Sequence, residues 1–149
     1  MSVLEGGCLC GAVRYRIEGG LGGADACYCH CGTCRKAAGA PVVAWVTFPR
    51  ARLKVTKGAT ASFSASDRAV REFCPDCGTQ LFFTYVKGPE ETDVTVASLD
   101  DPDAVRPQQH IWHESRVHWL EIEDELPRFE REGPDAPEEW KEEGGRAAG

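Results

Sequence analysis

Eight cysteines in a chain of 149 residues constrain this protein more than any other feature of its sequence. The sequence opens without a basic, apolar signal segment and contains no apolar stretch of the roughly 20 residues that a membrane helix needs. We therefore expect a cytoplasmic protein, whose thiols stay reduced and whose clustered cysteines bind metal rather than form disulfides. The cysteines fall into three groups: Cys8 and Cys10; Cys27, Cys29, Cys31 and Cys34; and Cys74 and Cys77.

The third group, in the sequence CPDCG at residues 74–78, is typical of a zinc knuckle. Two cysteines separated by two residues can direct both sulfurs at one ion, and the following glycine permits the tight turn. A structural zinc takes four ligands, so a second pair must come from elsewhere. Cys8 and Cys10 are the natural donors, because residues i and i+2 of an extended segment point to one face. We expect a closed site on Cys8, Cys10, Cys74 and Cys77.

The middle group contains the pattern CxCxxC, formed by Cys29, Cys31 and Cys34. Three protein ligands leave the fourth position of a tetrahedral zinc open for water or substrate, as a catalytic zinc requires. The alternative is that Cys27 is the fourth ligand and closes a second structural site. Against it, three cysteines on one face of an extended segment, together with Cys34, fit a tetrahedral ion poorly. Cys27 would then be a buried thiol.

The rest of the sequence predicts a mainly β protein. One short helix is expected at residues 33–38, ended by Gly39. The segment after Phe129 is rich in Glu, Gly, Pro and Ala, so we expect one domain over residues 1–129 and an acidic, disordered tail over residues 130–149. Segments rich in Val, Thr, Phe and Trp predict strands at residues 13–17, 42–48, 52–56, 70–73, 80–85, 93–99 and 117–122.

The charge distribution argues against nucleic acid as a partner. The formal net charge is −7, and no basic cluster stands out beyond Arg35 and Lys36. These two residues either hold a carboxylate of a small anionic thiol or are solvated charges on the short helix.

The four histidines are expected to be supporting or structural residues, not metal ligands. His30 is expected to face away from its two cysteine neighbours and to support or pack against them, not to bind metal. Trp45 either forms a wall of the open metal position or is a core aromatic residue. The three remaining histidines are expected to be structural: His110, His113 and His118.

Six features in sequence order resemble one protein family: GGCLCGAVRY, CHCGTCRKAAGAP, Trp45, EFCPDCGTQLF, VASLDDP and HIWHESRVHW. Together they are similar to the glutathione-dependent formaldehyde-activating enzyme family, which includes the domain of centromere protein V. The likeness covers residues 4–129. It implies a β-tent fold of small antiparallel sheets stapled by zinc, with one short helix.

The resemblance also implies two zinc ions per chain and a reaction. The family carries out carbon–sulfur lyase chemistry on S-(hydroxymethyl)glutathione, the adduct of formaldehyde and glutathione. We therefore expect a carbon–sulfur lyase that acts on a small thiol or glutathione adduct. Cys27 is not part of the family's zinc pattern. The implied ligands are Cys8, Cys10, Cys74 and Cys77 for a structural zinc, and Cys29, Cys31 and Cys34 for a catalytic zinc.

Two other functions fit the same cysteines. The first is a non-catalytic, zinc-stabilised binding module for a protein partner. The second is a thiol-based redox or metal-storage protein, which is disfavoured because no thioredoxin-like βαβ pattern accompanies the CxxC sequence. An open zinc site should exchange a ligand with small thiols or chelators, whereas a closed site should not.

Overall fold

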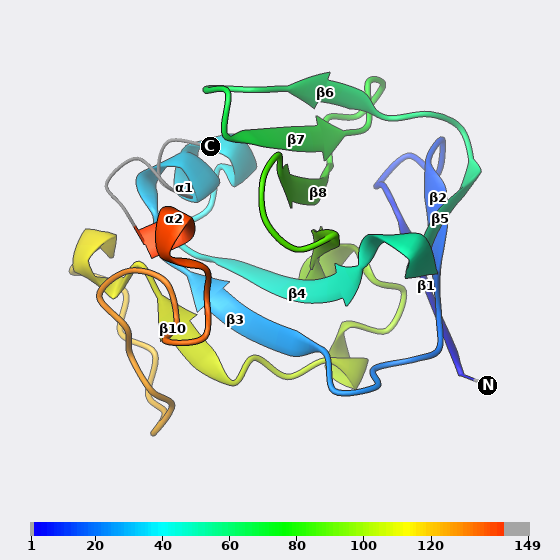
Figure 1. The fold of residues 1–149 in the computed structure, drawn as a ribbon. Helices are drawn as coiled ribbons and strands as arrows, with labels where there is room; N and C mark the ends of the chain where they lie inside the picture. Colours follow the sequence, from blue (N-terminus) through cyan, green and yellow to red (C-terminus); the bar gives the residue numbers. More distant parts are fainter. Residues whose placement is uncertain (1, 142–149) are drawn as a thin grey trace.

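The computed structural model describes residues 2–141, whose strands form two sheets (Figure 1). The three-stranded sheet has the order β1-β2-β5. Its strands span Val3–Gly7 (β1), Arg14–Glu18 (β2) and Leu53–Lys57 (β5). The seven-stranded sheet has the order β10-β3-β4-β9-β8-β7-β6. Its strands span Asp25–Cys29 (β3), Val43–Pro49 (β4), Ala61–Phe63 (β6), Ala69–Phe73 (β7), Gln80–Tyr85 (β8), Glu91–Thr95 (β9) and Gln109–Ile111 (β10).

Most strand pairs are antiparallel, and only β10 and β3 pair in parallel within the described residues. The helix α1 spans Gly32–Ala38 and ends at Gly39, whose φ of 64° is left-handed. A single turn, α2, spans Glu138–Lys141. The expected mainly β class, with small sheets and one short helix, is confirmed. Four 3₁₀ turns span Arg50–Arg52, Val96–Ser98, Pro102–Ala104 and His113–Ser115.

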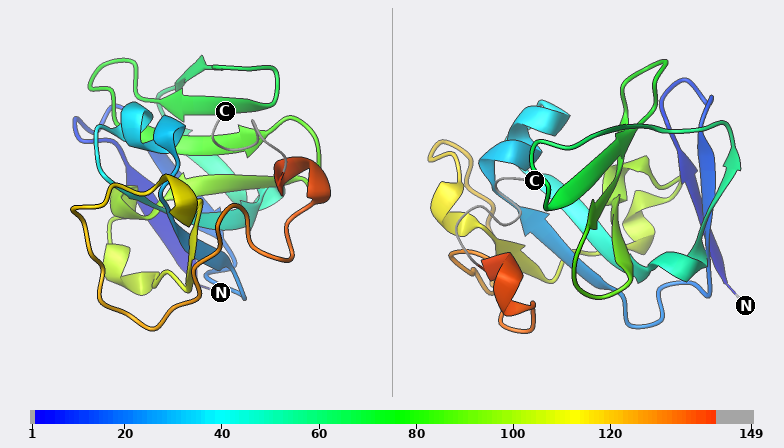
Figure 2. Two further views of the ribbon diagram at one scale, coloured as in Figure 1. Left: turned by 90° about the vertical axis from the view of Figure 1, so that its left-hand side faces the viewer. Right: turned by 45° about the horizontal axis from the view of Figure 1, so that its top comes forward.

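The two faces of the seven-stranded sheet have different partners, because side chains alternate along each strand. Val46 and Val94 lie on the face that packs against Tyr15 and Ile17 of the three-stranded sheet, and form the main core. Trp45, one residue from Val46, lies on the opposite face with the cysteines of the middle group. Figure 2 shows α1, α2 and the chain after β10 gathered at this end of the molecule, away from the three-stranded sheet.

The expected strand at residues 117–122 is wrong, since these residues form no strand. Val117 and Trp119 favour a strand by residue type, but the outer edge of β10 is taken by a later segment: the His110 N–H donates to the Pro127 carbonyl, and the Phe129 N–H donates to the His110 carbonyl. Trp119 is 75% exposed. Arg128 instead holds the loop by donating to the backbone carbonyls of Ile122 and Leu126. The strand expected at 93–99 ends at Thr95, where a 3₁₀ turn follows.

Part of the expected tail packs on the domain. Glu132 is buried and accepts hydrogen bonds from the Tyr85 hydroxyl and the Trp112 indole N–H, at 2.9 and 3.2 Å. The ring of Trp140 stacks on Tyr85 with centroids 4.1 Å apart. These specific contacts attach residues 130–141 although the segment has few apolar residues. The remainder of the expected tail, residues 142–149, lies outside the described residues.

None of the helices among residues 2–141 is both long and apolar enough to span a membrane.

Candidate metal centres

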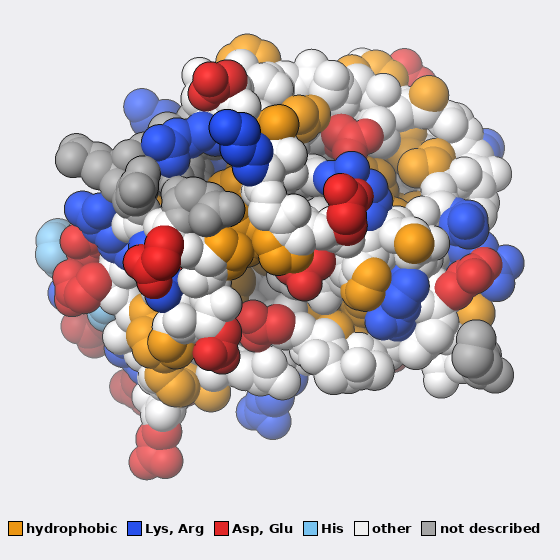
Figure 3. Space-filling view, viewed as in Figure 1, with side chains coloured by type: hydrophobic (Ala, Val, Ile, Leu, Met, Phe, Trp, Pro, Cys, Tyr) orange, Lys and Arg blue, Asp and Glu red, His pale blue; other side chains and the backbone are white. Residues whose placement is uncertain are grey.

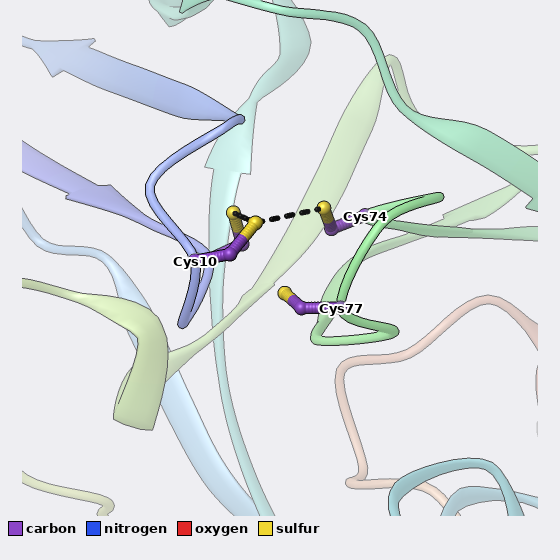
Figure 4. A group of neighbouring side chains, drawn as sticks. Cys10, Cys74 and Cys77 are labelled. Atoms are coloured by element: carbon purple, nitrogen blue, oxygen red, sulfur yellow. Dashed lines mark hydrogen bonds between the residues drawn. The ribbon is translucent and has the colours of Figure 1, made fainter.

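The four-cysteine group, formed by Cys8, Cys10, Cys74 and Cys77, joins the two sheets. Cys8 and Cys10 lie in the turn between β1 and β2, whereas Cys74 and Cys77 lie in the turn between β7 and β8. All four sulfurs lie within 4.8 Å of one another. In Figure 4 the labelled side chains of Cys10, Cys74 and Cys77 point toward a common centre. The structure thus brings together the four cysteines that the spacing had paired.

Local backbone geometry directs these sulfurs. The backbone N–H of Val13 donates to the Cys8 sulfur at 3.2 Å, and that of Asp76 donates to the Cys74 sulfur at 3.4 Å. Gly78 adopts a φ of 80°, which closes the knuckle turn as expected. Cys8 and Cys10 converge through a turn, however, not through the extended segment that the sequence had suggested.

The distances in this group fit a zinc ion. Zinc–sulfur bonds of about 2.3 Å in a tetrahedron place neighbouring sulfurs about 3.8 Å apart. The sulfur of Cys10 is 3.6 Å from that of Cys8 and 3.8 Å from that of Cys74. Hydrogen bonds from Thr79 lower the pKa of Cys77 to about 5, which favours the thiolate that a metal needs.

The three-cysteine group, formed by Cys29, Cys31 and Cys34, is built from the end of β3 and the start of α1. Cys29 is the last residue of β3, Cys31 is the N-cap of α1, and Cys34 is the buried residue of that helix. The Cys31 sulfur accepts the backbone N–H of Cys34 at 3.3 Å, as an N-cap side chain does. The three sulfurs lie within 4.8 Å of one another.

Burial makes the three-cysteine group chemically different from the four-cysteine group. Cys29 and Cys31 are fully buried, and Cys34 is 1% exposed. Burial raises the pKa of the Cys29 thiol, whereas hydrogen bonds from Cys29 and Cys34 lower the pKa of Cys31 to about 2. A soft divalent ion such as zinc would allow all three cysteines to be thiolates.

Cys27 does not join the three-cysteine group. Among residues 2–141, no fourth ligand atom of a Cys, His, Asp or Glu lies within 4.8 Å of all three sulfurs. Cys27 is buried on β3, opposite Trp45 of β4, and its side chain lines a cleft. The group thus offers three sulfur ligands, as the CxCxxC pattern had suggested.

Two polar residues that the sequence analysis missed contact the three-cysteine group. Arg71 of β7 donates from Nη2 to the Thr33 hydroxyl at 3.1 Å and to the Cys34 sulfur at 3.5 Å. The Thr33 hydroxyl in turn lies 3.4 Å from the Cys31 sulfur. A signal existed for Arg71, because strand alternation places it with Ala69 and Phe73 on one face.

His30 lies outside the metal group, as expected, and belongs to a buried polar chain. Its Nε2 is 2.8 Å from Nδ1 of His110, and His110 Nε2 is 2.9 Å from the carboxylate of Asp124. Burial and the neighbouring His110 and His113 lower the pKa of His30 to about 4, so its ring is neutral at pH 7. His30 and His110 therefore support the segment between Cys29 and Cys31 from the opposite face.

Two other predicted residues have defined places. Arg35 donates to the backbone carbonyl of His30 at 2.8 Å and to that of Ser115, so it ties two loops together and is not simply a solvated charge. Trp45 is 2% exposed and packs near Phe83 with ring centroids 6.0 Å apart. Its indole N–H has no hydrogen-bond partner in the part of the chain that the structure describes.

A cleft of about 710 Å³ is lined by Cys27, which lies two residues before Cys29 on β3. Figure 3 shows the hollow in the middle of the face seen in Figure 1, with acidic side chains around it. Asp25, Asp93 and Glu91 lie on its wall, and Trp140 lies at its side. Burial, together with neighbouring Asp93, raises the pKa of Asp25. The cleft reaches β3 at Cys27 and so approaches the strand that carries Cys29.

A family model and one relative of this chain name the same family. The model of a family described as glutathione-dependent formaldehyde-activating enzyme matches residues 3–115. A Halomonas elongata protein named for the same activity is 33% identical over 134 residues, covering 81% of this chain and 82% of that protein. A Schizosaccharomyces pombe protein named an uncharacterized lyase is 31% identical over 88 residues, covering 59% of this chain and 62% of its own length.

A solved structure shares the fold. The crystal structure of a Rhodobacter sphaeroides protein superposes with a TM-score of 0.53 at 24% sequence identity. The match covers 83% of this chain and 98% of the other.

Proposed function

The chain belongs to the glutathione-dependent formaldehyde-activating enzyme family, and from this premise we propose that it is a zinc-dependent carbon–sulfur lyase acting on a small thiol adduct. The membership agrees with the resemblance that the sequence motifs had indicated. The proposed substrate is S-(hydroxymethyl)glutathione or a similar adduct of formaldehyde with a small thiol. The proposed zinc ions are a structural ion on Cys8, Cys10, Cys74 and Cys77, and a catalytic ion on Cys29, Cys31 and Cys34.

One observation carries the proposal. The three-cysteine group holds three convergent sulfurs without a fourth ligand among residues 2–141. A cleft reaches Cys27, which lies on the same strand as Cys29. A closed structural zinc has four protein ligands, whereas a catalytic zinc keeps one position for substrate. The first group, with four sulfurs, supplies the closed counterpart in the same molecule.

The chemistry follows from sulfur and charge. Zinc would supply a positive charge that stabilises the sulfur of the adduct as a thiolate at neutral pH. In cleavage, the C–S bond breaks and its electron pair stays on sulfur, while the hydroxymethyl oxygen loses its proton and becomes the carbonyl oxygen of formaldehyde. That proton ends on the released sulfur, directly or through water, so the products are formaldehyde and the free thiol. The reverse reaction forms the same bond. Cys29, Cys31 and Cys34 would hold the metal, and their burial keeps bulk water from these sulfurs.

The test begins with the metal content of the reduced, freshly purified protein, followed by titration with a weak chelator. We expect two zinc ions, one of which the chelator removes readily. The same sample is then assayed for formation and cleavage of formaldehyde adducts, with glutathione and with 2-mercaptoethanol as the thiol. Acceleration that is lost when the labile zinc is removed, and restored when it is added back, supports the lyase.

The binding module is the competing function. It predicts one zinc, or two equally inert ions, and no acceleration with either thiol. Those results would contradict the proposed lyase activity and leave Cys29, Cys31 and Cys34 as structural thiols.

A further inference from the structure

A buried arginine lies against the three-cysteine group. Arg71 is only 4% exposed, and its guanidinium carbon lies 4.8 Å from the centre of the Phe83 ring. The same guanidinium donates to Cys34 and Thr33. A buried charge is costly unless nearby groups compensate it, so the placement of a cation beside cysteine sulfur calls for an explanation.

The contacts of Arg71 reach two of the three sulfurs. A guanidinium only donates hydrogen bonds, so the Thr33 hydroxyl must accept from Arg71. The single proton of that hydroxyl is then available to the Cys31 sulfur, 3.4 Å away. Arg71 thus contacts Cys34 directly and Cys31 through Thr33.

We propose that Arg71 is a positioning residue that balances the charge of the three-cysteine metal centre and thereby sets how tightly this centre holds its ion. The inference rests on the proposed function, since it requires a divalent metal on Cys29, Cys31 and Cys34. Three thiolates and a divalent zinc carry one net negative charge, and a neighbouring cation offsets it in a buried setting. The hydrogen bonds to Cys34 and Thr33 also fix the orientation of two ligands.

Arginine suits this role better than lysine. Both hydrogen bonds leave one nitrogen, Nη2, whose two N–H groups have fixed directions in the guanidinium plane, while the flat face lies on Phe83. Lysine would keep the charge but lose these fixed directions and most of the stacking. A lysine variant therefore separates the contribution of charge from that of geometry.

The experiment measures metal release from the zinc-loaded protein into a chromophoric chelator. Cys34→Ala identifies the phase that belongs to the three-cysteine group. The variants are Arg71→Met, which removes the charge, and Arg71→Lys, which retains it. The control is Arg131→Met, because Arg131 also packs on an aromatic ring, Trp112, at 5.8 Å. Cobalt-loaded samples report the sulfur-to-metal charge-transfer band of each variant.

In Arg71→Met we expect release from the three-cysteine group to be about 10–100-fold faster, the usual effect of losing a partner of a metal ligand. The cobalt band should shift, and the slower release from the four-cysteine group should not change. Arg71→Lys should recover part of the lost affinity, and Arg131→Met should behave as wild type.

The outcomes separate the two proposals. If the wild type binds two ions and Arg71→Met releases both at wild-type rates, the role of Arg71 is overturned while the lyase stands. If the wild type binds no ion at the three-cysteine group, both proposals fall. If Arg71→Met loses both ions, the fold is lost and a second variant, Thr33→Val, decides. Faster release from the three-cysteine group alone in Thr33→Val supports the role of the contacts from Arg71 through Thr33 to Cys31. Unchanged release in Thr33→Val overturns the proposal.

Discussion

At the scale of single residues, the two cysteine groups differ in their surroundings more than in their ligands. Cys10 is exposed and Cys77 is half-buried, whereas Cys29, Cys31 and Cys34 are buried. Buried thiolates depend on a cation or on hydrogen bonds for their stability. The three-cysteine group should therefore respond more strongly than the four-cysteine group to changes in the polar side chains around it.

Cys34→Ala should abolish activity without unfolding the protein. The substitution removes one of three proposed ligands, so we expect one zinc to be lost and the rate to fall more than about a hundredfold, beyond the usual effect of changes around a metal site. The free energy of unfolding should fall by about 1 kcal/mol, as for an average substitution. Metal analysis, the adduct assay and thermal unfolding check this. Global unfolding of Cys34→Ala would contradict the division of roles between the two groups.

Asp124→Asn tests the buried histidine chain through pH. Burial acts to raise the pKa of Asp124, but hydrogen bonds from His110, the Leu126 N–H and Arg128 outweigh it and lower the pKa from 3.8 to about 2. A lowered pKa in the folded state adds stability above pH 4, and this stability is lost as the pH falls toward 2. Denaturant unfolding at pH 7, 5 and 3 should show wild type more stable than Asp124→Asn at pH 7 and 5, with a smaller difference at pH 3.

The matched control for this prediction is Asp103→Asn. Asp103 is exposed, and its substitution removes the same formal charge as Asp124→Asn. Its stability difference from wild type should be small at all three pH values. A gap between wild type and Asp124→Asn that stayed constant down to pH 3 would argue against a stabilising ionised carboxylate at this position.

At the scale of elements, α1 is only seven residues long and depends on its ends. Gly39 ends it in the left-handed conformation, with no neighbouring atom within 4 Å of an added Cβ. Gly39→Ala should therefore cost about 1 kcal/mol through backbone strain alone. Thermal unfolding should show a decrease of roughly 2–4 °C in Tm.

Gly39→Asn is the control, since asparagine tolerates the left-handed conformation better than alanine. Its Tm should lie between those of wild type and Gly39→Ala. Equal Tm values for wild type and Gly39→Ala would mean that α1 is held by Cys34 and its surroundings, not by its C-terminal cap.

At the scale of the whole molecule, the four-cysteine group connects the two sheets. The turn after β1 belongs to the three-stranded sheet, and the turn after β7 belongs to the seven-stranded sheet. Other links run beside it, including the ion pair of Arg14 with Asp100 and the hydrogen bond of Tyr15 to Ser98 at 2.7 Å. A metal in this group would make its binding energy part of the folding energy.

Cys74→Ala should therefore destabilise the whole domain. We expect a loss of about 3 kcal/mol or more in the free energy of unfolding, or roughly 10 °C in Tm, together with loss of the tightly held zinc. Thermal unfolding and metal analysis measure both effects, with Cys27→Ala as a cysteine control outside either group. A Cys74→Ala protein as stable as Cys27→Ala would show that the packing between the sheets suffices without the metal.

Features that depend on local spacing and composition could be predicted from the sequence. The intervals between cysteines indicated two groups of four and three sulfurs, and Gly39 indicated the end of α1. Segments rich in Val, Thr, Phe and Trp indicated six of the strands, but not β1, β3, β6 and β10. Each of these predictions follows from backbone geometry or residue type over a few residues. The family followed from the order of the same motifs. The metal-binding and catalytic roles of the cysteines stay predictions until metal content and activity are measured.

The polar residues around the cysteine groups are brought there by long-range packing. Arg71 meets Cys34 because β7 lies near the start of α1, and Glu132 is buried because Tyr85 and Trp112 converge on it. Residues 117–122 have strand-like composition but no strand beside them. A strand requires a hydrogen-bonded neighbour, and a buried charge requires compensating groups, and both come from distant parts of the chain. Such long-range pairings are set by the order of strands in the sheets, which local sequence patterns do not specify.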